Sequence, residues 1–249
     1  MDKIKIIKNR SDIGAGTRGA DLGVDAIELD VVVSGDHQIV VSHEPFMSKI
    51  TCLKPNGEEI TVEEDQNINL FQMSYKEIRK YDCGLKPNYK FPNQKSLIAF
   101  KPLLDETIVA CEDFIESSCK SAVDYIIEIK SKEEWYNSYY PEPEIYVDLI
   151  LKTLESVVAK GNIILKSFDV NILNEIHKQK PDQRMSLLIN RDENIEEKLK
   201  RINFVPEIIG PYFELLDRDT VVKYKGLGFQ IFPWTINVYD DIQRIKDYG

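Results

Sequence analysis

Short apolar runs alternate along the chain with longer segments in which apolar residues recur every three to four positions. This alternation is typical of βα units built around a parallel sheet. Seven apolar runs predict strands, at residues 4–7, 26–33, 124–129, 162–166, 185–189, 207–209 and 229–232. The segments between them predict amphipathic helices, among them 105–119, 144–159, 170–179, 194–201, 217–225 and 239–248. The pattern therefore predicts an α/β fold.

Residues 44–100 depart from this rhythm, and a hairpin precedes them. The turn Ser34-Gly35-Asp36 separates the run 26–33 from an alternating run at 38–42, which predicts a hairpin-like extension that ends at His43. Residues 44–100 carry several prolines and a Ser74-to-Glu77 capping box that begins one short helix. We expect a single domain over residues 1–249, with an insertion at about 44–100 over one face.

Length and charge narrow the class of protein. A chain of 249 residues can bury one large core, and no apolar run is long enough to span a bilayer. The net charge of −10 argues against a nucleic-acid or anionic membrane surface, although it allows a local cationic pocket for one phosphate. The first residues mix charged with apolar side chains and lack a signal-peptide pattern, which predicts a cytoplasmic protein. Export of the parent protein stays open, because an altered start would remove a signal without trace.

The four cysteines are Cys52, Cys83, Cys111 and Cys119, and no two of them form a C-x-x-C pair. This spacing disfavours a zinc site or a redox motif. It predicts reduced, partly buried thiols in a reducing compartment.

Candidate metal ligands lie on two of the predicted strands. Glu28 and Asp30 are two residues apart, so their carboxylates project from the same face and repel each other unless a cation compensates them. Mg²⁺ and Ca²⁺ prefer such oxygen ligands. On the strand at 124–129, Glu128 offers a third carboxylate, and Lys130 shares its face as a phosphate-binding point charge. The alternatives are a solvated acidic pair and an ordinary ion pair.

His43 follows an apolar run and precedes a loop, where its ordinary pKa suits proton transfer near neutral pH. His37, in a polar turn, and His177, within an amphipathic helix, are expected to be ordinary polar surface residues. Trp234 ends a strand with a ring on which glycerol carbons could pack, although a buried structural tryptophan fits equally well.

Together these segments resemble the glycerophosphodiester phosphodiesterase family. The resemblance runs from about Asp21 to Gly249 and rests on five motifs in the family's order. They are the stretch 21–31 with its Glu-Leu-Asp, the Val-Val-Ser-His-Glu at 40–44, the Ile-Glu-Ile-Lys at 127–130, the Lys-Ser-Phe-Asp at 166–169 and the Pro-Trp-Thr-Ile-Asn at 233–237.

The resemblance implies a TIM-type (β/α)8 barrel whose site lies at the C-terminal ends of the strands. It also implies metal-dependent hydrolysis of glycerophosphodiesters to sn-glycerol 3-phosphate and an alcohol, a reaction of lipid and glycerol metabolism. By motif match Glu28, Asp30 and Glu128 would hold Mg²⁺ or Ca²⁺, and His43 would exchange protons. Lys130 would bind the phosphate group, and Trp234 would contact the rest of the substrate. The motifs do not choose between the two cations, and they specify neither the alcohol nor the oligomeric state.

Both ends depart from the family pattern. The family begins with a strand that ends in His-Arg-Gly, and the nearest counterpart here offers Asn9 at the histidine position and Arg10 at the phosphate-binding arginine. The family's last strand also has no counterpart before Gly249, so we expect an incomplete barrel of about seven strands. Asn9 could not take over the role of the family's histidine, because an asparagine does not exchange protons near pH 7. The alternative to an enzyme, intact or impaired, is an inactive metal- and phosphodiester-binding protein or fragment.

Overall fold

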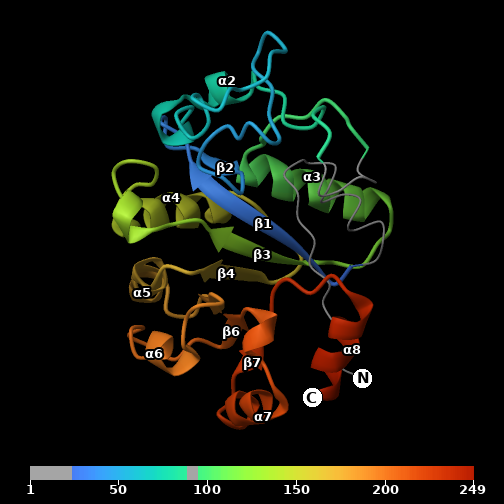
Figure 1. The fold of residues 1–249 in the computed structure, drawn as a ribbon, viewed down its shortest axis with the longest axis vertical. Coiled ribbons are helices and arrows are strands. Elements are labelled where there is room, and N and C mark those ends of the chain that lie inside the picture. The colour runs from blue at the N-terminus through green and yellow to red at the C-terminus, as the bar shows by residue number, and fades with distance from the viewer. Residues whose placement is uncertain (1–23, 89–94) are drawn as a thin grey trace. The chain divides into compact units, whose positions relative to one another are not determined.

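The computed structural model describes residues 24–88 and 95–249, and its contacts divide the chain into two compact units, Met1–Ile163 and Ile164–Gly249 (Figure 1). The strand predicted at residues 4–7 and the candidate Arg10 lie outside the described residues. No helix of the described part is both long enough and apolar enough to cross a membrane.

The first unit is built on a long buried strand. In β1 (Ala26–Val33) every residue except Glu28 is buried. This strand pairs antiparallel with β2 (Ile39–Val41) and parallel with β3 (Asp124–Ile129). The register sets Val31 opposite Val41 and Asp30 opposite Glu128. The predicted hairpin and the two predicted strands are confirmed, and the register decides which polar side chains meet.

Two amphipathic helices pack on these strands (Figure 1). The first, α3 (Leu104–Ser117), buries Leu104, Ile108 and Ile115, which recur on one face, and has acidic residues in its first turn, where the helix dipole favours them. The second, α4 (Pro143–Glu155), begins with a proline at a position that needs no backbone donor. Its buried Tyr146 hydroxyl donates a 2.8 Å hydrogen bond to the Val31 carbonyl and so ties α4 to β1.

The segment between β2 and α3, where we predict an insertion, contains little regular structure in its described residues. The helical parts described there are the short η1 (Leu70–Gln72) and α2 (Tyr75–Ile78), and the capping box of Ser74 and Glu77 begins α2 as expected. Leu53 pairs antiparallel with Asp82, which brings Cys52 and Cys83 together in a disulfide. The prediction that all four thiols are reduced is therefore wrong for this pair, because spacing along the chain does not show which loops meet.

The second unit repeats the βα pattern. Its strands are all parallel in the order β4 (Ile163–Ser167), β5 (Met185–Ile189), β6 (Ile208–Pro211) and β7 (Gln230–Ile231). Its helices are α5 (Val170–Gln179), α6 (Ile195–Leu199), α7 (Arg218–Gly226) and α8 (Tyr239–Asp247). Two 3-10 turns, η2 (Glu133–Trp135) in the first unit and η3 (Phe213–Leu215) in the second, complete the described elements.

Element ends are where sequence and structure differ. The helix predicted at 105–119 ends at Ser117, because Cys119 adopts a left-handed backbone conformation with φ of 52°. The helix predicted at 144–159 ends at Glu155. After it, the chain passes so close to β3 that a Cβ on Gly161 would lie 1.9 Å from the Val123 carbonyl oxygen. An apolar stripe does not reveal such terminations.

The disulfide gives a prediction about stability. Replacing Cys52 and Cys83 by serine frees a loop with a sequence separation of 31 residues, so the unfolded chain gains entropy. We expect the free energy of unfolding to fall by about 3–4 kcal/mol in denaturant titrations under oxidising conditions. Serine at the buried Cys111 is the control for simple loss of a thiol. Equal stability of the double variant and the wild type would contradict the prediction.

Candidate functional site

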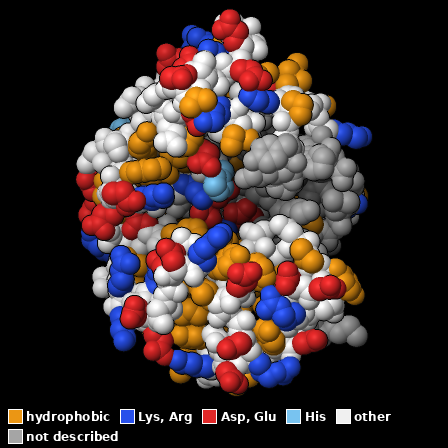
Figure 2. All heavy atoms as spheres, viewed as in Figure 1, with side chains coloured by type: hydrophobic (Ala, Val, Ile, Leu, Met, Phe, Trp, Pro, Cys, Tyr) orange, Lys and Arg blue, Asp and Glu red, His pale blue; other side chains and the backbone are white. Residues whose placement is uncertain are grey.

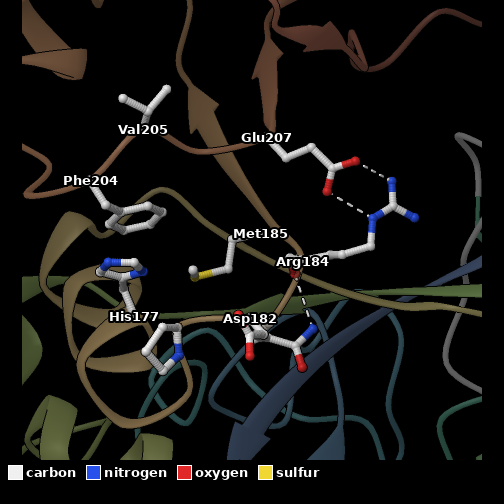
Figure 3. Close-up of a pocket in the computed structure, with 9 residues that line it drawn as sticks. His177, Asp182, Arg184, Met185, Phe204, Val205 and Glu207 are labelled. Atoms are coloured by element: carbon white, nitrogen blue, oxygen red, sulfur yellow. Dashed lines mark hydrogen bonds and ion pairs between the residues drawn. The ribbon is translucent and has the colours of Figure 1, made fainter.

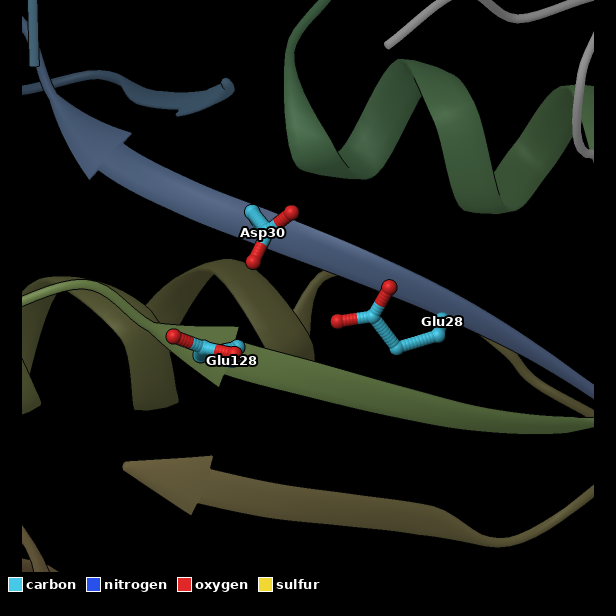
Figure 4. Close-up of side chains that lie close together, drawn as sticks. All are labelled: Glu28, Asp30 and Glu128. Atoms are coloured by element: carbon cyan, nitrogen blue, oxygen red, sulfur yellow. The ribbon is translucent and has the colours of Figure 1, made fainter. Parts of the chain in front are cut away.

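Three carboxylates converge on the β1–β3 pair (Figure 4). Glu28 and Asp30 leave the same face of β1 because they are two residues apart. Glu128 lies on β3 directly opposite Asp30. Ligand oxygens of the three residues lie within 4.8 Å of one another. The structure thus brings together the three residues that the sequence singled out as metal ligands.

Negative charge exceeds positive charge in this cluster of side chains. Asp30 is only 8% exposed, and burial, followed by the charges of Glu28 and Glu128, raises its pKa to about 7. Lys130 opposes this effect, since its Nζ lies 2.7 Å from Glu128 Oε1 and 3.7 Å from Asp30 Oδ1. One ammonium beside three carboxylates leaves net negative charge at the site.

A hard divalent cation fits this donor set. The cluster offers only oxygen ligands, which Mg²⁺ and Ca²⁺ prefer. The raised pKa of Asp30 shows that the folded protein disfavours its ionised form, and a bound cation would relieve that cost. Glu28, Asp30 and Glu128 are therefore the residues that could hold the ion.

His43 joins this cluster from the loop that follows β2. Its ring Nδ1 lies 2.8 Å from Glu44 Oε1, and its Nε2 lies 3.4 Å from Lys130 Nζ. The bond to Glu44 is the main reason that the pKa of His43 lies above its usual value, and the same bond lowers the pKa of Glu44. The side chain of His43 is 65% exposed, so its ring can reach a ligand from solvent. Figure 2 shows a histidine side chain at the surface with basic and acidic side chains beside it.

Two residues next to this group were not among the sequence candidates. Glu44 orients the ring of His43. Lys101 is 4% exposed, and its Nζ donates a 2.7 Å hydrogen bond to the Ser42 hydroxyl. A signal for Lys101 was present, since it is a lone charge within the apolar stretch Ala99-Phe100-Lys101-Pro102-Leu103. Nothing local in the sequence shows that this stretch meets the end of β2.

Trp234 lies in the second unit, Ile164–Gly249. Its ring Nε1 donates a 2.9 Å hydrogen bond to the Gly210 carbonyl, and its ring packs against Phe168 and Tyr212 at centroid distances of 5.3 and 5.4 Å. The indole is half-buried and held by its own unit. Its predicted role in substrate binding stays a prediction, as does that of Arg10, which is outside the described residues.

A separate pocket of the second unit is lined by nine residues, none of which is a sequence candidate for the site (Figure 3). His177 stacks on Phe204 with ring centroids 4.3 Å apart. Arg184 and Glu207, which also line the pocket, form a two-pronged ion pair. His177 is held by this ring stacking.

Comparison with known proteins identifies the family. The model of the glycerophosphoryl diester phosphodiesterase family matches residues 13–249, so it begins earlier than the resemblance at Asp21. A glycerophosphodiester phosphodiesterase of Caldanaerobacter subterraneus subsp. tengcongensis is 26% identical over 257 residues, covering 99% of this chain and 91% of that protein.

Solved structures show the same fold. A protein of Silicibacter pomeroyi DSS-3 assigned to the glycerophosphoryl diester phosphodiesterases superposes with a TM-score of 0.86 at 22% identity, covering 99% of this chain and 87% of that one. A phosphodiesterase of Oleispira antarctica, solved with the product sn-glycerol-3-phosphate, superposes with a TM-score of 0.75 at 16% identity, covering 98% and 90%. The predicted TIM-type α/β fold is confirmed, with seven strands in the described residues. The chain belongs to the glycerophosphoryl diester phosphodiesterase family.

Proposed function

We propose that this chain hydrolyses glycerophosphodiesters to sn-glycerol 3-phosphate and an alcohol in a reaction that depends on Mg²⁺ or Ca²⁺. The observation that carries the proposal is the meeting of three carboxylates, Lys130 and His43 where β2 and β3 end beside the middle of β1. Membership of the family supports the reaction class, a phosphoric diester hydrolysis. The product bound to the Oleispira antarctica phosphodiesterase is consistent with it.

In this proposal Glu28, Asp30 and Glu128 hold the cation. When bound, the ion supplies positive charge against the phosphoryl oxygens as negative charge develops on them. Lys130 adds a second positive charge at the same place, since its ammonium already lies between Glu128 and Asp30. A phosphate oxygen that enters the site would then meet the Lys130 ammonium beside the residues that would hold the cation.

His43 is the proton-transfer residue of the proposal. The bond from Nδ1 to Glu44 fixes the ring and leaves Nε2, which faces Lys130, to exchange a proton. The raised pKa keeps the imidazole protonated to higher pH than an ordinary histidine. His43 therefore donates a proton to the departing alkoxide from Nε2, and this contributes roughly 10²–10⁴-fold to the rate.

The remaining assignments are also proposals. Trp234 and Arg10 contribute to substrate binding, and the substrate is a small molecule. A cytoplasmic location is the sequence-based prediction. The Cys52–Cys83 disulfide weighs against it, because disulfides persist mainly in oxidising compartments.

Cation binding is testable without turnover. We expect millimolar Mg²⁺ or Ca²⁺ to raise the melting temperature of the wild type at pH 8, with a stabilisation of about 2.7 kcal/mol at a hundredfold excess over Kd. The effect should weaken at pH 5, because Asp30, with a pKa of about 7, is then protonated and cannot bind the ion as a carboxylate. Asp30→Asn should abolish the shift. Glu112→Gln, which alters a buried carboxylate bonded to Tyr125, should retain it.

Turnover tests His43. We expect His43→Ala to lower kcat for release of glycerol 3-phosphate from glycerophosphocholine by roughly 10²–10⁴-fold. His37→Asn, at an exposed turn, is the matched control and should retain activity. Full activity of His43→Ala would remove this residue from the mechanism. Metal-dependent binding of the diester without turnover by the wild type would instead favour the inactive alternative.

The dependence of kcat/KM on pH tests whether Glu44 raises the pKa of His43. Glu44→Gln removes the main cause of the raised pKa of His43, so the imidazole loses its proton at lower pH. Because the protonated form donates to the leaving group, the alkaline limb of the kcat/KM profile should move to lower pH. The same displacement should appear in the NMR titration of the His43 ring. Glu58→Gln, on the exposed surface of the insertion, should leave both curves in place, and an unmoved profile for Glu44→Gln would refute the assignment.

A further inference from the structure

Lys101 is a buried lysine next to the loop that carries His43, and the proposed mechanism does not use it. It precedes α3 in a segment that pairs with β2. The Val41 amide donates a 2.8 Å hydrogen bond to the Pro102 carbonyl, and Val40 lies opposite Leu103. This pairing fixes the Lys101 backbone against the end of β2. Only 4% of the lysine is exposed.

The Lys101 ammonium is connected by hydrogen bonds to the residues on both sides of His43. Its Nζ donates to the Ser42 hydroxyl at 2.7 Å, and that hydroxyl donates to the Glu44 carbonyl at 2.6 Å. A charged donor polarises a hydroxyl, so the second bond is strengthened by the first. The Ser42 amide also donates to the Asp30 carbonyl at 2.9 Å. The loop is thus held at Ser42 and Glu44, while the His43 side chain between them projects outward.

Burying this ammonium has a cost. Lysine is rarely buried without a partner, and loss of hydration lowers the pKa of Lys101 to about 8. Its hydrogen bond goes to a neutral hydroxyl, which returns less than a carboxylate would. An apolar side chain of similar length would pack at this place without the cost. The charges of Glu44 and Asp30 offset part of this cost, since they favour the protonated lysine.

We propose that Lys101 is a positioning residue for the hydrolysis: through the Ser42 hydroxyl it holds the His43–Glu44 backbone so that the imidazole stays bonded to Glu44 and faces Lys130. The inference rests on the proposed role of His43. Lys101 acts through that residue and touches neither substrate nor cation. Its loss should therefore change the chemical step and leave cation binding unchanged.

Two substitutions test the connection. Lys101→Met keeps the length of the side chain and removes the charge, and Ser42→Ala removes the hydroxyl while the lysine remains. We expect each substitution to lower kcat by about ten- to a hundredfold. KM and the metal-induced rise in melting temperature should each change by less than about twofold. Ser42→Ala provides the measurement if Lys101→Met does not fold. A wild-type kcat in either folded variant would overturn the inference.

A double-mutant cycle separates positioning from a general structural role. If Lys101 acts through His43, then adding Lys101→Met to His43→Ala should lower kcat no further. Losses that multiply in the double variant would overturn the inference. Tyr125→Phe, which removes a buried 2.9 Å bond to Glu112 in the same unit, is the control for lost stability. It should lower the melting temperature and leave kcat unchanged.

The result that would disprove the role of His43 differs from the result that would disprove the role of Lys101. If His43→Ala retains the wild-type kcat, the proposed role of His43 is wrong, and the inference about Lys101 falls with it. If His43→Ala is impaired while Lys101→Met and Ser42→Ala are fully active, only the inference about Lys101 is wrong. An NMR titration of the His43 ring adds a direct readout, since loss of the bond to Glu44 in Lys101→Met should lower the pKa of His43.

Discussion

The parallel register between β1 and β3 is the constraint on which the site depends. It sets Asp30 beside Glu128, and the two-residue period of β1 adds Glu28 to the same face. A shift of one residue would turn these carboxylates into the opposite layer and expose Leu29 in their place. The apolar residues between the acids therefore do more than fill the core, because their burial fixes which side chains face each other.

Ionisable groups from other elements reach the negative charge concentrated by this register. Lys130 comes from the end of β3, and His43 comes from the loop after β2. These residues are far apart in sequence and meet because β1 lies between β2 and β3. The site combines strong mutual repulsion with a few directed hydrogen bonds. Such a site is sensitive to small displacements, and the buried Ser42 hydroxyl limits them.

Much of this could be predicted from the sequence. Period-two and period-three-to-four patterns located β1, β3, β5 and α5 at their exact bounds, because these elements are held by apolar faces that the pattern records. Strand periodicity put Glu28 and Asp30 on one face, and the structure brings Glu128 to them; the roles of these residues and of His43 stay predictions. What escaped prediction was long-range: the Cys52–Cys83 bond, the Lys101–Ser42 bond and the ends of helices set by Cys119 and Gly161. Each depends on where a loop goes after it leaves its element.

The segment between β2 and α3 begins and ends at the same place in the first unit. The chain departs at His43 and returns at Lys101, and the hydrogen bond from Lys101 to Ser42 closes this excursion across a sequence separation of 59 residues. The entropy of closing a loop grows only with the logarithm of its length. The excursion can therefore lengthen, shorten or change sequence over evolutionary time while its two ends stay fixed, which leaves it free to diversify as a module separate from the chemistry.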